Sequence, residues 1–89
     1  MSKPRAPWWS YVKTVVRRYP GTPEREAIAA AINEFSGKPD ILHFVDLLYW
    51  KRSCSMYGAA EICHISYATA RNWNRAFLKC VAHHMGLPE

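Results

Sequence analysis

The chain has 89 residues, with twelve Lys and Arg against seven Asp and Glu and a formal net charge of +5. This length favours one domain with no room for a second, because domains of roughly 50 to 200 residues are the usual unit. No stretch approaches the roughly 20 apolar residues that span a bilayer, and the N-terminal residues do not resemble a secretory signal, so we expect no membrane contact and a cytoplasmic location. The positive charge favours a polyanionic partner.

The first predicted helix lies between Trp8 and Tyr19, where apolar residues recur at steps of three and four. This spacing predicts an amphipathic helix of about three turns. Trp8 and Trp9 are adjacent, so at most one of them can face the core fully. The other tryptophan is either partly buried against the third helix or marks a protein contact, because tryptophan is enriched at interface anchors.

The second and third predicted helices begin at residues that commonly cap helices. Thr22 is the expected N-cap of the second helix, with Pro23 at the first helical position and the end of the helix near Phe35. Asp40 is the expected N-cap of the third helix, which continues through Trp50. Apolar residues cover so much of the circumference of the third helix that we predict it to be central and mostly buried.

The last two helices are predicted from Met56 to Cys63 and from Ser66 to about His84, and their short connection predicts a helix-turn-helix. Two helices that cross through so short a turn need small side chains where they approach. Three alanines supply them: Ala59, Ala60 and Ala70. The predicted fold is therefore all-α, a compact bundle of four or five helices with N-terminal helices in residues 1–38 and a helix-turn-helix unit in residues 39–89.

The turn between these two helices has a suitable residue at each position. His64 occupies the position most often filled by glycine, and histidine is enriched among the non-glycine residues that adopt positive φ. Ile65 points back into the core, and Ser66 is the N-cap of the following helix. Gly86 and Leu87 have the form of a Schellman stop at the end of that helix. Two side chains are expected to close the small core of this unit: Cys63 and Trp73.

The helix that starts at Ser66 separates an apolar stripe from a polar one. The polar stripe follows steps of three and four and carries no acidic residue: Ala68, Arg71, Asn72, Arg75 and Lys79. Side chains near the N-terminus of a recognition helix reach base edges in the major groove, where arginine pairs with guanine and asparagine with adenine. We therefore assign five residues to base contacts: Tyr67, Ala68, Arg71, Asn72 and Arg75. Four residues are better placed for phosphates: Ser66, Lys79, Lys51 and Arg52. The alternative interpretation is an ordinary solvated helix face.

The three cysteines lack the regular spacing of a disulfide framework, so we predict free thiols in a reducing compartment: Cys54, Cys63 and Cys80. Cys80 shares a helix with His83 and His84 at metal-ligand spacing, and Cys63 with His64 could complete a zinc site. Packing roles for both cysteines are the favoured interpretation. No third group is identifiable to orient a nucleophilic Cys and His pair. We therefore predict no metal, no cofactor and no enzymatic activity.

Short motifs along most of the chain carry a family resemblance. They are Trp-Ser-Tyr-Val-Lys at 9–13, Arg-Arg-Tyr-Pro at 17–20, Glu-Arg-Glu-Ala-Ile at 24–28, Leu-Leu-Tyr-Trp-Lys-Arg-Ser at 47–53, Gly-Ala-Ala at 58–60, Ile-Ser-Tyr-Ala-Thr-Ala-Arg-Asn-Trp at 65–73 and Val-Ala-His-His-Met-Gly-Leu at 81–87. With these motifs the chain resembles the RinA-type phage transcriptional regulators, small activators whose C-terminal helix-turn-helix is similar to region 4 of bacterial sigma factors. The resemblance implies control of phage or prophage late genes, binding near a promoter and contact with host RNA polymerase. Family members carry a longer segment before the Glu-Arg-Glu helix, where this chain has only Pro20 to Pro23.

The sequence leads to one principal function and two alternatives. A sequence-specific regulator that binds double-stranded DNA as a homodimer accounts for both the charge and the helix-turn-helix. A DNA-packaging protein of the small-terminase class would use the same motif but assemble into rings. A protein-interaction module would present the basic face to an acidic partner such as RNA polymerase or a host defence protein.

Overall fold

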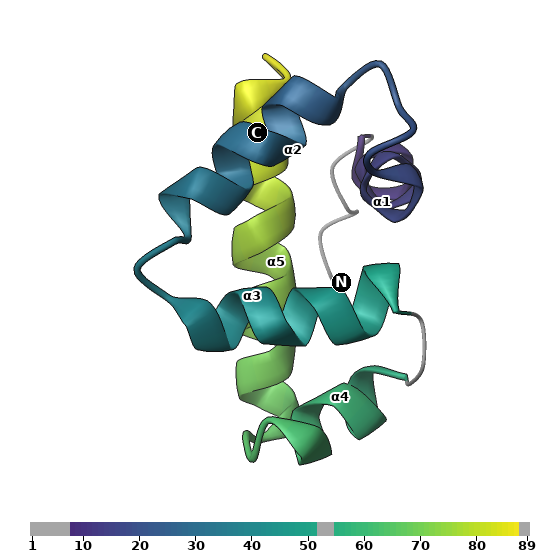
Figure 1. The fold of residues 1–89 in the computed structure, drawn as a ribbon. Coiled ribbons are helices and arrows are strands. Elements are labelled where there is room, and N and C mark those ends of the chain that lie inside the picture. The colour runs from purple at the N-terminus through teal and green to yellow at the C-terminus, as the bar shows by residue number, and fades with distance from the viewer. Residues whose placement is uncertain (1–7, 52–54, 88–89) are drawn as a thin grey trace, which may run out of the picture.

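The computed structural model of the chain describes residues 8–51 and 55–87, and within them it has five α-helices, one π-helical segment and no strand. The elements in chain order are α1 (Trp9–Arg18), α2 (Arg25–Glu34), α3 (Pro39–Val45), η1 (Asp46–Trp50), α4 (Met56–Ile62) and α5 (Tyr67–His84) (Figure 1). The prediction of a small all-α bundle is confirmed. None of the helices in these two ranges has the length and apolar character that crossing a membrane requires.

Helix α5 is the axis of the bundle, because it contacts each of the other four α-helices. In Figure 1, α2 crosses the C-terminal part of α5, α3 crosses nearer the middle, and α4 lies at the N-terminal end. The third predicted helix corresponds to α3 and η1 together and is largely buried, as predicted. It contacts α1, α4 and α5, but the 18-residue α5 also packs extensively on α2, so α5 and not the third helix is the centre of the bundle.

The hydrophobic core draws on every helix, so the N-terminal helices and the helix-turn-helix share it. Phe77 of α5 packs edge-on against Phe35 at the end of α2, with 5.7 Å between ring centroids, and against Trp50 of η1, at 6.3 Å. The indole Nε1 of Trp50 donates a hydrogen bond of 2.9 Å to the carbonyl oxygen of Val16 in α1. These contacts connect α1, α2, η1 and α5 through neighbouring side chains.

The first helix agrees with its prediction, since α1 lies between Trp8 as N-cap and Tyr19 as C-cap. Trp8 is the tryptophan that enters the core, with 7% of its surface exposed. The side chain of Trp9 lies outside the described part of the structure, so the prediction about a protein contact by this residue stays a prediction.

Two predicted helix starts were wrong. Thr22 does not cap α2, because its hydroxyl donates to the Glu24 carboxylate at 2.5 Å and the helix begins only at Arg25. The third helix begins at Pro39 instead of after Asp40, since proline suits the first helical position, where a missing N–H group costs nothing. Asp40 then lies in the first turn of α3, near the positive end of the helix dipole.

The third helix ends in a π-helical turn that the apolar spacing did not indicate. The amide of Lys51 donates to the carbonyl oxygen of Asp46 at 2.8 Å, a bond that spans five residues instead of four. Tyr49 in this turn is fully buried, and its hydroxyl donates to Oδ1 of the buried Asn74 in α5. Burial raises the pKa of Tyr49 to about 12, so the neutral phenol is the form that the core accommodates.

Candidate nucleic-acid interface

The connection between α4 and α5 is a Schellman turn. The amide of His64 donates to the carbonyl oxygen of Glu61 at 3.1 Å, and the amide of Ile65 donates to that of Ala60 at 3.0 Å, which is the paired pattern of this motif. His64 has a φ of 58°, so the prediction that it occupies the left-handed position is confirmed. Ile65 is half-buried and packs against the core, which fixes the direction in which α5 leaves the turn.

The contact surface between α4 and α5 also agrees with the prediction. The three alanines expected at the closest approach are all buried: Ala59, Ala60 and Ala70. Cys63 and Trp73 are half-buried and pack at the edge of the core, where the Trp73 ring lies 6.0 Å from that of Phe44. Because small side chains separate the two helices, their backbones approach closely and hold α5 in a defined orientation against α4.

Ser66 is the N-cap of α5, as predicted. Its Oγ accepts a hydrogen bond from the backbone amide of Thr69 at 3.1 Å and donates to the Thr69 hydroxyl at 3.0 Å. The proton of the Ser66 hydroxyl is therefore used inside the cap. A phosphate contact by this hydroxyl would have to displace Thr69, because a phosphate oxygen needs a donor.

The residues assigned to the polar stripe of α5 are brought together on one exposed face. All five are exposed, while the opposite face of the helix is buried: Ala68, Arg71, Asn72, Arg75 and Lys79. The two ion pairs found in residues 8–51 and 55–87 involve other residues, so neither arginine nor the lysine is neutralised by an acidic side chain there. The face is uncharged or positive along its whole length, which suits a polyanion.

Lys51, also assigned to a phosphate, lies after η1 and not on this face of α5. Lys51 follows η1, which contacts α4, and its Nζ is 3.5 Å from the carboxylate of Asp46. A phosphate would have to compete with Asp46 for this exposed lysine. Lys51 is therefore a weaker candidate for a phosphate contact than the sequence suggested. Arg52, the remaining candidate, lies outside the described residues.

An aromatic pair at the start of α5 includes a residue that the sequence analysis missed. Tyr67, assigned to a base contact, stacks on Tyr57 of α4 with 4.1 Å between ring centroids and 8° between ring planes. Tyr57 is 68% exposed and Tyr67 is 40% exposed. The two tyrosines are ten residues apart, and only the crossing of α4 over α5 places one ring on the other. No periodicity within either helix could have shown this pair.

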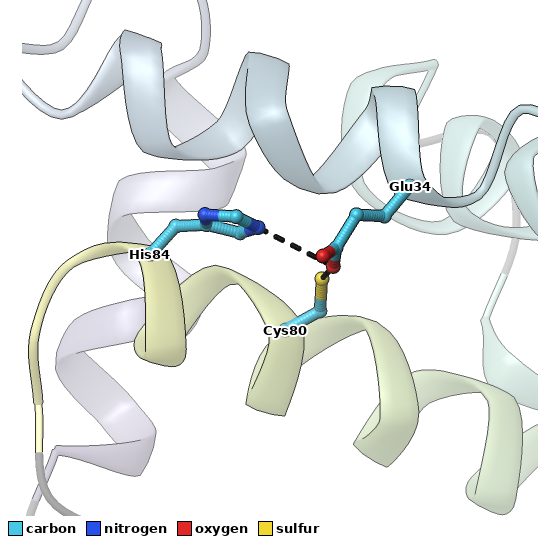
Figure 2. A group of neighbouring side chains, drawn as sticks. All are labelled: Glu34, Cys80 and His84. Atoms are coloured by element: carbon cyan, nitrogen blue, oxygen red, sulfur yellow. Dashed lines mark hydrogen bonds and ion pairs between the residues drawn. The ribbon is translucent and has the colours of Figure 1, made fainter.

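The metal ligands considered from the sequence are not assembled as a set. Cys63 and His64 lie before the N-terminal end of α5, whereas Cys80 and His84 lie near its C-terminal end. The structure instead brings Glu34 of α2 to the latter pair (Figure 2). Cys80 is a free thiol, as predicted, and Cys54 lies outside the described residues.

Comparison of this chain with protein-family models, curated proteins and solved structures gives no match. The resemblance to the RinA-type regulators therefore stays a prediction.

Proposed function

We propose that the chain is a sequence-specific regulator that binds double-stranded DNA and reads the major groove with the N-terminal half of α5. The observation that carries the proposal is the exposed face of α5 on which Arg71, Asn72 and Arg75 stand together without acidic partners. An α-helix with its side chains is about 10 to 12 Å across, which fits a major groove about 12 Å wide. Helix α4 and the Schellman turn hold α5 in place and leave this face open.

Each residue of the face has a chemical partner on DNA. Arg71 and Arg75 can pair with O6 and N7 of guanine, and Asn72 can pair with N6 and N7 of adenine, each contact contributing about 1 to 3 kcal/mol of discrimination. Ala68 is small enough to meet the methyl group of thymine. Lys79 lies about 16 Å along the helix from Ala68, which suits a phosphate at the groove edge better than a base. Tyr67 and Tyr57 would lie beside the duplex as an aromatic pair.

The biological setting follows from the resemblance. We propose that the regulator acts on phage or prophage late genes in the cytoplasm of the bacterial host, with host RNA polymerase as a further partner. A homodimer fits a short chain, because small domains bury a modest share of their surface and often gain stability from a partner subunit. In this proposal the protein binds DNA and catalyses no reaction.

The first test is selection from a random duplex library at near-physiological salt, using purified protein whose size in solution has been measured. We expect an enriched palindrome with half-sites about one helical turn, or 34 to 36 Å, apart. The affinity should fall with salt, with a log-log slope of about −0.9 per neutralised phosphate. Equal binding to the selected and scrambled duplexes would contradict the proposal, and a ring of many subunits would indicate a packaging protein instead.

Substitutions on α5 test the assigned contacts. We expect Arg71→Ala and Arg75→Ala each to lower affinity for the selected duplex by about 5-fold to 150-fold, the equivalent of 1 to 3 kcal/mol, and to relax preference at one base position. Arg25→Ala is the matched control, because Arg25 is an exposed arginine on α2. Circular dichroism should show unchanged helix content in all three variants. An equal loss in the control would indicate a general charge effect.

A second candidate function is supported by the apolar side chains exposed on α4. Tyr57 is 68% exposed and Ile62 is 51% exposed, and such side chains can mark a protein-binding surface. In that case α4 and α5 would bind a protein such as RNA polymerase. Two results together would favour this function over direct DNA recognition. The protein would enrich no duplex from the library, and its binding to purified polymerase would be lost on Tyr57→Ser.

A further inference from the structure

Three side chains that commonly ligate transition metals meet where α2 crosses the C-terminal part of α5: Glu34, Cys80 and His84 (Figure 2). One ligand atom from each lies within 4.8 Å of the other two. The Glu34 carboxylate oxygen Oε2 is 2.6 Å from Sγ of Cys80 and 3.3 Å from Nε2 of His84. The carboxylate, the thiol and the imidazole therefore point into one small volume.

The fold positions these groups through two separate helices. Cys80 and His84 are four residues apart on α5, so their side chains lie on the same face of the helix, about 5 to 6 Å apart at Cβ. Glu34 is the last residue of α2, and the next residue, Phe35, packs on Phe77 of α5 with ring centroids 5.7 Å apart. This aromatic contact fixes the end of α2 beside α5 and so holds the carboxylate next to the other two ligands.

We propose that Glu34, Cys80 and His84 form a binding site for one Zn²⁺ ion, with a water molecule as the fourth ligand. Zn²⁺ binds thiolate, imidazole and carboxylate ligands in tetrahedral geometry, with bonds of about 2.3 Å to sulfur and about 2.0 to 2.2 Å to nitrogen and oxygen. Calcium and magnesium are excluded by the sulfur and nitrogen ligands, because both ions prefer oxygen.

The present distances require only a small adjustment. In a tetrahedral zinc site the ligand atoms stand roughly 3.3 to 3.6 Å apart, given the bond lengths above. The separation of Glu34 from His84 already fits, while the carboxylate and the thiol must move apart by about 1 Å. Sγ of Cys80 and Nε2 of His84 lie within 4.8 Å of each other and need to come at most about 1.3 Å closer. The Glu34 side chain is 55% exposed and the His84 side chain 26%, so rotation of the carboxylate and entry of the ion and a water both have room.

Binding replaces one set of interactions with another and involves no redox change. Without metal, the Cys80 thiol donates its proton to the Glu34 carboxylate, which also pairs with His84. Burial and then the neighbouring Glu34 raise the pKa of Cys80 to about 12, so the thiol is protonated in this state. On binding, the S–H bond of Cys80 breaks and its proton passes to solvent, and Nε2 of His84 gives up to solvent the proton that faces Glu34. Zinc then forms bonds to Sγ of Cys80, Nε2 of His84 and a Glu34 oxygen.

The zinc site does not rest on the proposed DNA contacts. It lies near the C-terminal end of α5, whereas the exposed basic face begins at the N-terminal end. Bound zinc would join α2 to α5 and stabilise the folded chain in proportion to the logarithm of the ion concentration. It can be tested without DNA.

The experiment uses the full chain with Cys54→Ser and Cys63→Ala, which leaves Cys80 as the sole thiol of the sequence. The reduced, metal-free protein is titrated with Co²⁺ and then with Zn²⁺. We expect one Co²⁺ per chain, with a thiolate-to-cobalt charge-transfer band and the intense visible bands of tetrahedral Co²⁺. Zn²⁺ should bleach these bands, because it binds such sites more tightly, and should raise the melting temperature as its concentration rises.

Single substitutions identify the ligands. Cys80→Ala, His84→Gln and Glu34→Gln should each weaken zinc binding by more than about 10-fold, the loss expected even for a partner outside the first shell of ligands. His83→Gln is the matched control, because His83 precedes His84 on α5 but is not in the cluster. Circular dichroism of each metal-free variant confirms that it is folded. Any of three results would overturn the proposal. The first is the absence of a one-to-one complex, the second is metal binding that survives both Cys80→Ala and His84→Gln, and the third is an equal loss of binding in His83→Gln.

Discussion

The two ends of α5 differ in what surrounds them, although both carry positive or potentially positive side chains. In the N-terminal half, Arg71 and Arg75 face solvent and have no acidic partner among the described residues. Near the C-terminal end, His84 faces the carboxylate of Glu34 at 3.3 Å. A cation stabilises a helix near its C-terminus, where the dipole is negative, and gains nothing from the dipole near the N-terminus.

Interactions within the fold account for the charged side chain at the C-terminal end of α5 but not for the arginines of its N-terminal half. The C-terminal end satisfies its charges within the fold, through Glu34 on α2. Arg71 and Arg75 have no such partner among the described residues, which leaves them free to make the DNA contacts that we propose. This contrast is the physical basis of the functional proposal.

Phe77 lies between the two ends and tests whether they form one cooperative unit. It contacts Phe35 on the side of α2 and Trp50 on the side of η1. We expect Phe77→Ala to lower the free energy of unfolding by about 3 to 5 kcal/mol, because a buried ring is replaced by a cavity. Urea unfolding followed by tryptophan fluorescence and circular dichroism should remain coincident, with Lys79→Ala as an exposed control within about 0.5 kcal/mol of wild type. Separate transitions would show that the ends of α5 unfold independently.

The buried pair of Tyr49 and Asn74 makes the middle of α5 sensitive to alkali. Burial raises the folded-state pKa of Tyr49 to about 12 from its ordinary value of 10, so the contribution of this tyrosine to stability is complete below pH 10 and is lost as the pH rises through 12. The loss should reach roughly 2 kcal/mol by pH 12. Tyr49→Phe cannot ionise, so the stability difference between wild type and this variant should shrink between pH 10 and pH 12. A constant difference would contradict the assignment.

The stop at the C-terminal end of α5 depends on a glycine. Gly86 has a φ of 77°, and a Cβ added there would meet no atom within 4 Å, so only the backbone conformation opposes a side chain. We expect Gly86→Ala to lower the free energy of unfolding by about 1 to 2 kcal/mol, the cost of a left-handed residue with a Cβ. Thermal or urea unfolding of the wild type and the variant measures this difference in the free energy of unfolding. A neutral effect would mean that the helix end frays without loss.

The turn before the N-terminal end uses a histidine in the same conformation. His64 has a φ of 58°, a backbone conformation that glycine adopts easily but a residue with a Cβ does not. We therefore expect His64→Gly to relieve backbone strain. The gain should stay below about 1 kcal/mol, because the added glycine also increases the freedom of the unfolded chain. A loss of stability instead would show that the His64 side chain has a role of its own, and binding to the selected duplex would then be the next measurement.

The helix-turn-helix could be predicted from the sequence because each of its positions has a local requirement. A positive φ at His64, a cap at Ser66 and small residues at the crossing are all properties of single positions. The true starts of the second and third helices could not be predicted in this way. The Thr22 hydroxyl binds the neighbouring Glu24 side chain instead of capping the helix, and Pro39 starts the third helix before Asp40 can cap it. Local patterns therefore indicated helices more reliably than the residues at which they begin.

The remaining features depend on contacts between distant parts of the chain. The thiol of Cys80 and the carboxylate of Glu34 are separated by 46 residues, and no spacing within α5 could have added the latter to the ligand set. The stacking of Tyr57 on Tyr67 depends in the same way on the crossing of two helices. The polar stripe of α5 was predictable because one helix contains it whole.

The π-helical turn η1 determines where this fold can tolerate a change in length. A π turn holds one residue more than an α turn, so residues 46–50 contain one residue beyond the α-helical repeat. Loss of one residue there would convert the turn to α-helix and leave the faces before and after it in their present directions. Loss of one residue from the middle of α5 would rotate everything beyond it by about 100° and bring buried side chains to the surface. A single-residue deletion is therefore compatible with the core at η1 and incompatible with it in α5.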